Sequence, residues 1–200
     1  MSGVDHSVAV KNTFVVVAAR IDKTLPSGGA RMTVERRELN RALRTLAERY
    51  AAAAAAALGP RLVSAVLFGS VVRGEAGPAS DLDLFLVVRD LPAGRFRRLE
   101  LVEPVRDRLE QDLAAARAQG WEGDLSVILR TPAEAARFHV LYLDMTRESV
   151  VLYDAQGFFA GLLDRVRARL AELGARRVYL GRAWYWDLKP DFRPGEVIEL

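Results

Sequence analysis

Apolar residues recur at helical spacing in several stretches of this chain. Between residues 34 and 58 the apolar positions lie three or four residues apart, and alanines, which are strong helix formers, fill the second half. This pattern predicts an amphipathic helix that is capped near Thr33 and ends at Gly59-Pro60. Its predicted buried stripe is Leu39, Leu43, Leu46 and Tyr50.

Further helices are predicted downstream. One long amphipathic helix is expected to begin at Pro92 and to be closed by Gly120. A shorter helix is expected to start at the capping sequence Thr131-Pro132-Ala133-Glu134 and to continue toward Met145, and another covers residues 157–173. The predicted buried face of the long helix is Leu99, Val102, Val105, Leu109 and Leu113.

Short apolar runs bounded by turn residues predict four β-strands. They cover residues 62–68, 81–88, 124–129 and 150–153. Since these strands alternate with helices along the chain, the predicted fold class is α/β.

The first 31 residues differ from the rest. Their apolar runs are short and interrupted by Lys11 and Asn12, so they fit neither a signal peptide nor a membrane anchor. We interpret residues 1–31 as a weakly ordered arm, with a true start at Met32 as the alternative. Residues 32–135 are then the predicted core, and residues 136–200 a C-terminal extension packed on it.

Composition narrows the class of protein. The chain has 200 residues, of which 50% are hydrophobic and 28% charged, and this is typical of a globular domain. No apolar run approaches the roughly 20 residues of a membrane span, so no membrane partner is expected. Cysteine is absent, which excludes disulfides and thiolate metal sites. Without an export signal, the default location is the cytoplasm.

Two aspartates open the second predicted strand. Alternate residues of a strand face the same way, which places Asp81 and Asp83 on one face with side chains roughly 6–7 Å apart. Two like charges at that separation repel by about 2–3 kcal/mol at an effective dielectric constant near 20. A divalent cation between them reverses the sign, since Mg²⁺ is held by one or two carboxylates together with substrate phosphates.

The turn before this strand has the residues that a triphosphate needs. Gly69 lets the backbone approach a phosphate, Ser70 offers a hydroxyl and an amide, and Arg73 offers charged donors to a leaving pyrophosphate. With Mg²⁺ at Asp81 and Asp83, this inventory suffices for phosphoryl or nucleotidyl transfer.

A third carboxylate is expected nearby, to complete a second metal site or to accept a proton. Asp124, at the start of the next strand, is the first candidate for it. Glu122 is the rival, and Asp144 comes third.

The spacing from Gly69-Ser70 to Asp81-Leu82-Asp83 resembles the signature of the nucleotidyltransferase superfamily related to DNA polymerase beta, and residues 69–75 resemble its small "minimal" members. The resemblance implies that Gly69 and Ser70 contact the triphosphate. It also implies that Asp81, Asp83 and Asp124 hold two Mg²⁺ ions. The implied fold is a small mixed sheet with helices mainly on one face, the site at its exposed edge, and a C-terminal α/β extension.

The leading hypothesis is a Mg²⁺-dependent nucleotidyltransferase that transfers a nucleoside monophosphate, with AMP from ATP expected, to a hydroxyl of an unidentified acceptor. One alternative is an antitoxin that adenylylates a separate HEPN-type toxin. Another is a nucleotide-binding or interaction module without turnover. A role directed at RNA ranks third, because the net charge is only +3.

The remaining candidate binding or metal-ligating residues give weaker indications. Trp184 and Trp186 in the tail through Lys189 are expected to pack, with base stacking or a partner surface as alternatives. Lys189 is interpreted as a surface residue. His6 and His139 are isolated from any metal-like cluster, and His139 is expected to be packed or partly exposed.

Overall fold

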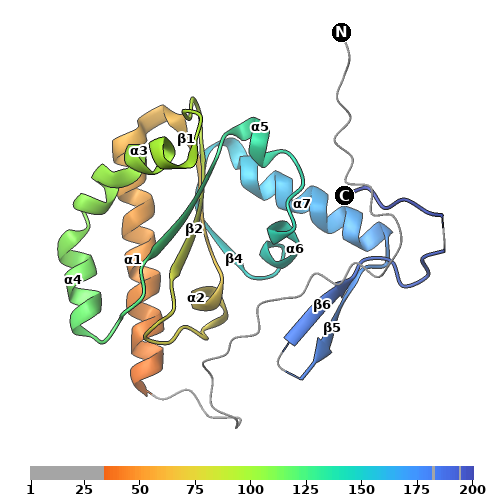
Figure 1. Ribbon diagram of the computed structural model, residues 1–200, viewed down its shortest axis with the longest axis horizontal. Helices are drawn as coiled ribbons and strands as arrows, with labels where there is room; N and C mark the ends of the chain where they lie inside the picture. Colours follow the sequence, from red (N-terminus) through yellow and green to blue (C-terminus); the bar gives the residue numbers. More distant parts are fainter. Residues whose placement is uncertain (1–33, 182, 194) are drawn as a thin grey trace.

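The computed structural model describes residues 34–181, 183–193 and 195–200 (Figure 1). The proposed arm at residues 1–31, the cap at Thr33 and His6 therefore lie outside the described residues. The helices are α1 (Val34–Leu58), α2 (Ser70–Arg73), α3 (Arg95–Asp107), α4 (Glu110–Ala118), α5 (Pro132–Ala135), α6 (Leu141–Met145) and α7 (Phe158–Glu172), with 3-10 turns at Gly59–Arg61 and Ala155–Gly157. The strands are β1 (Leu62–Phe68), β2 (Leu82–Val88), β3 (Leu125–Arg130), β4 (Ser149–Asp154), β5 (Arg176–Leu180) and β6 (Ala183–Asp187).

The central element is a four-stranded sheet in the order β3-β2-β1-β4. β1 runs antiparallel to both β2 and β4, whereas β2 and β3 are parallel. The crossover between the parallel strands carries α3 and α4, as a parallel connection requires. The predicted α/β class with a small mixed sheet is confirmed.

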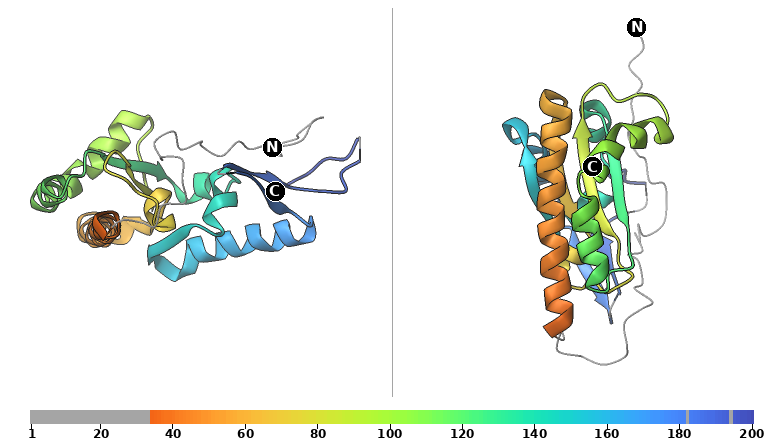
Figure 2. Two further views of the ribbon diagram at one scale, coloured as in Figure 1. Left: turned by 90° about the horizontal axis from the view of Figure 1, so that it is seen from below. Right: turned by 90° about the vertical axis from the view of Figure 1, so that its left-hand side faces the viewer.

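Helices cover both faces of this sheet, which corrects the expectation of helices mainly on one face. Figure 1 places α1, α3 and α4 on one side of the sheet and α5, α6 and α7 on the other, and Figure 2 shows the same two layers from below. Side chains alternate between the layers: Ala65 and Leu67 of β1 join the α1 core, whereas Val63 and Val66 join the α7 core. A strand buried on both faces has the continuous apolar run seen in β1.

The long helix predicted from Pro92 to Gly120 is two helices. α3 ends at Asp107, and the Leu109 amide donates to the Arg106 carbonyl in a tighter turn before α4 begins. Both helices still pack on α1, because Val102, Val105, Leu109 and Leu113 are buried as predicted and Leu99 is partly buried. The break leaves the apolar spacing intact, which is why periodicity alone does not reveal it.

The helix expected from Thr131 toward Met145 is also interrupted. Thr131 and Glu134 form the capping box, but α5 ends at Ala135 and α6 begins only at Leu141. Between them the chain turns so that Tyr142 is buried against Phe85 and donates its hydroxyl to the Ala135 carbonyl.

The C-terminal tail forms an antiparallel hairpin of β5 and β6, which the sequence patterns did not predict. Trp186 and Leu188 are buried against Leu143 of α6 and Leu170 of α7. The predicted packing role of Trp186 is therefore confirmed. The hairpin closes on the α6–α7 side of the molecule (Figure 1).

β4 lies beyond residue 135 and supplies an edge strand of the main sheet. The α7 layer also comes from this part of the chain. The core and the extension therefore share one sheet. The proposed domain division stays a prediction.

Candidate functional site

One end of the sheet brings the predicted site residues together. Asp83 of β2 pairs with Phe68, the last residue of β1, and with Ser126 of β3. Phe68 also pairs with Ser149 of β4, so these four residues form a row across the sheet. Asp83 shares its face with Phe85, which packs in the α7 layer.

Gly69 follows Phe68 directly and turns the chain beneath Asp83. Its φ is 81° and its ψ −152°, a conformation that favours glycine. A Cβ placed on Gly69 would overlap Asp83 Oδ2 and lie 3.3 Å from Asp83 Cγ. Gly69 is therefore required both by the turn and by the close approach of the carboxylate.

The loop from Gly69 to Asp81 is fastened to α1 by a buried asparagine. Asn40 Nδ2 donates to the Ala76 carbonyl at 2.9 Å, and the Ala76 amide donates to Asn40 Oδ1 at 3.2 Å. Arg36 adds a bond from Nε to the same carbonyl at 3.2 Å and a second from Nη2 to the Glu75 carbonyl. These bonds fix the middle of the loop.

A second fastening holds the end of the loop just before Asp81. The buried Trp121 donates from Nε1 to the Ser80 carbonyl at 2.7 Å. A Cβ on Gly123 would overlap the Ser80 carbonyl oxygen and lie 2.7 Å from Trp121 Nε1. Gly123 therefore lets this segment pass close to the residue that precedes Asp81.

Asp124 lies next to the pair but is already engaged. Its amide donates to Asp81 Oδ1 at 3.1 Å, and its own carboxylate accepts from the Leu125 amide at 2.8 Å and pairs with Arg106 at 2.9 Å. Burial raises the pKa of Asp124, but the Leu125 amide and the Arg106 guanidinium outweigh it and lower the pKa below its ordinary value. Such a carboxylate is a weaker base than a free one.

The fit of these residues to Mg²⁺ is good for two of the three carboxylates. Asp81 and Asp83 stand two residues apart at the start of β2, beside a turn whose backbone approaches Asp83. Asp124 would have to exchange Arg106 for a cation. Among the described residues no three His, Cys, Asp or Glu side chains are gathered for a metal ion, so the three-carboxylate site stays a prediction.

Ser70 and Arg73 begin and end α2. The Ser70 carbonyl accepts from the Glu75 amide at 2.9 Å, which closes the short helix. Arg73 pairs with Glu75 at 2.7 Å and with Glu148 at 3.3 Å. The side chain that was predicted to meet a triphosphate is therefore held by two carboxylates.

The alternative residues make contacts elsewhere in the structure. Glu122 is exposed before β3, and its amide donates to the Pro78 carbonyl at 2.8 Å. Asp144 accepts from Trp186 Nε1 at 2.9 Å and so belongs to the hairpin contact. Lys189 pairs with Glu196 at 2.7 Å. His139 is partly buried, as expected, and burial lowers its pKa.

Sequence reasoning missed the residues that position the loop. The sequence does contain a signal for Asn40. It is a polar residue beside Leu39 on the buried side of α1, where a hydrogen-bond partner is needed. Trp121 and Gly123 leave a weaker one, a bulky and a small residue just before a strand. Their partners are more than 35 residues away, and no local pattern identifies those partners.

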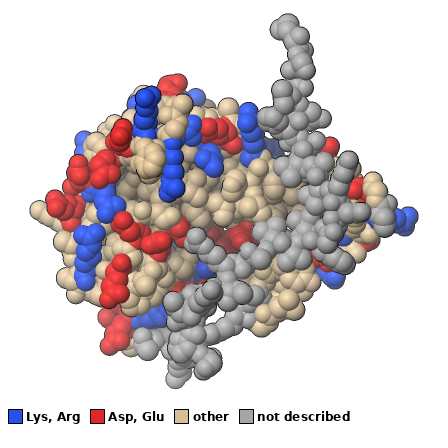
Figure 3. All heavy atoms as spheres, in the orientation of Figure 1, with Lys and Arg blue, Asp and Glu red and all other residues tan. Residues whose placement is uncertain are grey.

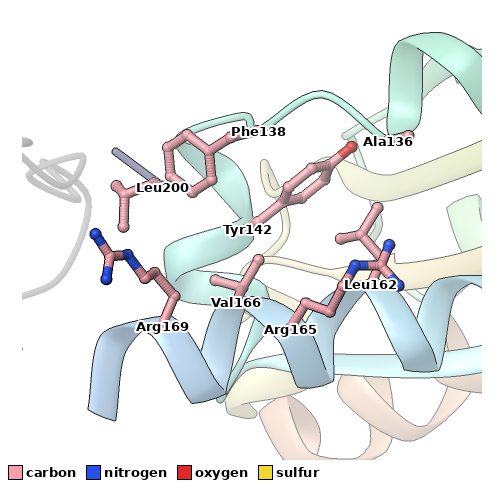
Figure 4. Close-up of a pocket in the computed structure, with 8 residues that line it drawn as sticks. All are labelled: Ala136, Phe138, Tyr142, Leu162, Arg165, Val166, Arg169 and Leu200. Atoms are coloured by element: carbon pink, nitrogen blue, oxygen red, sulfur yellow. The ribbon is translucent and has the colours of Figure 1, made fainter. Parts of the chain in front are cut away.

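A cavity of about 270 Å³ lies away from this sheet end, between α7 and the α5–α6 segment (Figure 4). Its lining is Ala136, Phe138, Tyr142, Leu162, Arg165, Val166, Arg169 and Leu200. None of these residues is a predicted site residue, so we do not assign the cavity to the site.

The surface bears on possible partners. On the face shown in Figure 3, basic and acidic side chains are interspersed over the α1, α3 and α4 side. Such mixing does not provide the basic stripe typical of nucleic-acid binding. In the described part of the chain, none of the helices combines the length and apolarity needed to span a bilayer.

Comparison with known proteins finds similarity over the part of the chain that contains this sheet end. Residues 50–147 match the model of the nucleotidyltransferase domain. Over 111 residues the chain is 27% identical to "Putative protein adenylyltransferase MJ1305" of Methanocaldococcus jannaschii, a match that covers 54% of this chain and 70% of that protein.

Solved structures show more distant likeness. A toxin–antitoxin crystal structure with AMP-PNP is 20% identical at a TM-score of 0.37, covering 68% of this chain and 92% of that chain. The solved complex of a tri-AMPylated Shewanella oneidensis HEPN toxin with an MNT antitoxin contains a chain that is 16% identical at a TM-score of 0.32, with 70% of this chain and 92% of that chain covered. At such scores the likeness carries no argument about function.

Proposed function

We propose that this chain transfers a nucleoside monophosphate, AMP from ATP, to a hydroxyl group, because residues 50–147 match the model of the nucleotidyltransferase domain. The observation that carries the proposal is the packing of Gly69 against Asp83 at the start of β2. The turn that would hold phosphates therefore lies directly beside Asp83, one of the two carboxylates that would hold their counter-ion.

Each residue then has a defined task. Asp81 and Asp83 would hold Mg²⁺, which when bound neutralises the phosphate oxygens and the leaving pyrophosphate. Gly69 and Ser70 would bring backbone amides and a hydroxyl to the triphosphate. Asn40 and Trp121 keep the loop between these groups in place.

The proposed reaction is a nucleophilic displacement at the α-phosphorus of ATP. The acceptor oxygen forms a bond to the α-phosphorus, the bond from that phosphorus to the oxygen bridging the β-phosphorus breaks, and pyrophosphate leaves. The acceptor proton leaves to solvent in this proposal, because the Arg106 pair makes Asp124 a poor acceptor. Asp124 remains the proposed third metal ligand, and its carboxylate would then release Arg106 and bind the cation.

For the acceptor we propose a protein hydroxyl. The support is the relative named as a protein adenylyltransferase, which matches over 70% of its own length. A HEPN-type toxin is the narrower form of this proposal, and the chain would then be its antitoxin. Cytoplasmic location is part of the same proposal.

The test uses ATP labelled at the α-phosphate and, separately, at the γ-phosphate. Incubation with Mg²⁺ and candidate protein acceptors is expected to transfer the α-label only and to release pyrophosphate, and Asp83→Asn is expected to abolish both. Transfer of the γ-label would instead indicate a kinase. Mg²⁺-dependent ATP binding, without pyrophosphate release from ATP in the presence of any candidate acceptor, would favour the nucleotide-binding module without turnover.

A further inference from the structure

The hairpin of β5 and β6 contacts the body of the protein through a buried arginine. The Arg177 side chain is only 3% exposed, and it pairs with Asp144 at 2.7 Å and with Glu148. Its guanidinium also lies 4.6 Å from the centre of the Trp184 ring and 5.5 Å from that of Trp186. A charge at this depth is retained only when it is well paired.

Asp144 of α6 accepts hydrogen bonds from Arg177 and from both tryptophans of the hairpin. Its Oδ1 accepts from Trp184 Nε1 at 3.1 Å and from Trp186 Nε1 at 2.9 Å as well as from Arg177. Burial opposes the charge of Arg177, but the hydrogen bonds to Glu148, Tyr179 and Asp144 outweigh it and raise the pKa of Arg177 above its ordinary value. The hairpin is thus docked by charged contacts as well as by apolar packing.

Glu148 connects this docked hairpin to the Gly69–Asp81 loop. One carboxylate oxygen accepts from Arg177 Nη1 and the other from Arg73 Nη1 at 3.3 Å. The Trp184 ring adds a contact, with the Arg73 guanidinium 5.5 Å from its centre. Glu148 precedes Ser149, which lies in the same row across the sheet as Asp83.

These contacts hold Arg73 without using all of its donors. Glu75 takes Nε and Glu148 takes one hydrogen of Nη1. Arg73 Nη2 has no hydrogen-bond or ion-pair partner among the described residues. A guanidinium has five N–H donors, so three remain for an anion.

We propose that the hairpin, acting through Glu148 and Trp184, positions Arg73 to bind the β- and γ-phosphates of the nucleotide. This inference rests on the proposed function and deepens it. It adds Arg177 and Trp184, which lie outside the residues that match the family model. Glu148 and Trp184 are positioning residues: they hold one edge of Arg73 while the free edge meets the triphosphate. Hairpin docking and triphosphate binding are then coupled, each favouring the other by the same factor.

The test measures the Kd for Mg-ATP by titration calorimetry. Glu148→Gln is nearly isosteric and removes the charge between the two arginines. It is expected to raise the Kd at least about fivefold, the lower end of typical coupling between sites. Trp184→Phe, which keeps an aromatic ring and loses the bond to Asp144, provides a second variant with the same expected direction.

A double-mutant cycle separates positioning from general structural damage. In an Arg73→Ala background, Glu148→Gln is expected to cause no further loss of Mg-ATP affinity, because its effect passes through Arg73. Asp187→Asn is the matched control, since Asp187 pairs with Arg176 in the same hairpin without touching Arg73 or Glu148. It is expected to leave the Kd unchanged. Circular dichroism confirms that each variant is folded.

Two results would overturn the proposal. One is an Mg-ATP affinity that Glu148→Gln and Trp184→Phe leave at the wild-type value while Asp83→Asn abolishes it, which would leave the proposed function standing alone. The other is an equal loss on Glu148→Gln with and without Arg73. Failure of the wild-type chain to bind Mg-ATP would refute the proposed function and this inference together.

Discussion

The contact between Gly69 and Asp83 is the residue-scale feature on which the candidate site depends. The two residues come from antiparallel strands joined by a loop, and the glycine has no Cβ where the carboxylate lies. Backbone close to a carboxylate is the arrangement needed if phosphate and metal are to meet there.

Gly69→Ala is therefore expected to damage both stability and nucleotide binding. The backbone conformation at Gly69, with φ 81° and ψ −152°, is adopted almost only by glycine and costs about 1–3 kcal/mol for alanine, and the new methyl group also displaces Asp83. Gly94→Ala is the matched control, because Gly94 has a φ of 89° and open space around its Cβ position. Denaturant unfolding should show a loss in both variants, whereas only Gly69→Ala should lose Mg-ATP affinity. Equal ATP affinity in the two variants would contradict the role given to the close approach.

The bidentate pair of Glu134 and Arg98 makes a second residue-scale prediction. Arg98 donates to both Glu134 oxygens at 2.8 Å, and these hydrogen bonds lower the pKa of Glu134 from 4.5 to about 2 despite burial. A lowered pKa in the folded state stabilises it above pH 4.5, and this stabilisation is lost as the pH falls toward 2.

Glu134→Gln is therefore expected to be less stable than wild type at neutral pH, with a difference that shrinks as the pH falls from 4.5 toward 2. Urea midpoints across this range provide the measurement. Glu172→Gln removes an exposed pairing partner of Arg169 and should change stability by less than about 1 kcal/mol. A pH-independent difference for Glu134→Gln would be inconsistent with the pair.

At the scale of elements, α1 does more than cover the sheet. Its buried Asn40 satisfies both the amide and the carbonyl of Ala76 in a loop 36 residues away. The helix thereby fixes the Gly69–Asp81 loop from the layer opposite the one that Asp83 and Phe85 face.

Asn40→Ala leaves the buried Ala76 amide without a partner and the Ala76 carbonyl with Arg36 alone, and it is expected to cost about 1–3 kcal/mol of unfolding free energy. Because the loop loses its middle fastening, Mg-ATP affinity should fall as well. Chemical denaturation and calorimetry measure the two effects. Glu38→Ala on the exposed side of the same helix is the control. Unchanged ATP affinity in a destabilised Asn40→Ala would mean that the loop holds its shape without α1.

Local sequence patterns predicted the elements whose ends are determined by neighbouring residues, such as prolines and glycines. β1 was predicted at 62–68 because an apolar run lies between Pro60 and Gly69, and the acidic pair was found because its spacing is local. The break between α3 and α4 was missed because the apolar spacing continues through it. The hairpin was missed because its strands are stabilised by Asp144 and Glu148, which belong to another part of the chain.

At the scale of the whole molecule, the sheet separates two helical layers. Both layers contact the Gly69–Asp81 loop at one end of the sheet. The α1 layer fixes the loop through Asn40, and the α7 layer with the hairpin reaches Arg73 through Glu148. The hairpin is therefore expected to unfold together with the sheet.

Trp186→Ala tests this unity. The side chain is 3% exposed and packs on Leu143 and Leu170, so its removal is expected to cost about 3–5 kcal/mol. Leu180→Ala, at a residue 67% exposed on the same hairpin, should cost far less. Urea unfolding followed by circular dichroism should show one transition moved to lower urea. Two separate transitions would mean that the hairpin unfolds independently.

Asp81 and Asp83 are proposed to hold a divalent cation beside the Gly69 turn. The most direct measurement is a crystal structure with Mn²⁺ and a non-hydrolysable ATP analogue, in which anomalous scattering locates the metal. We expect the metal to be bound to both carboxylates, with the triphosphate along Gly69 and Ser70. Metal and nucleotide bound at another place, with Asp81 and Asp83 touching neither, would contradict it.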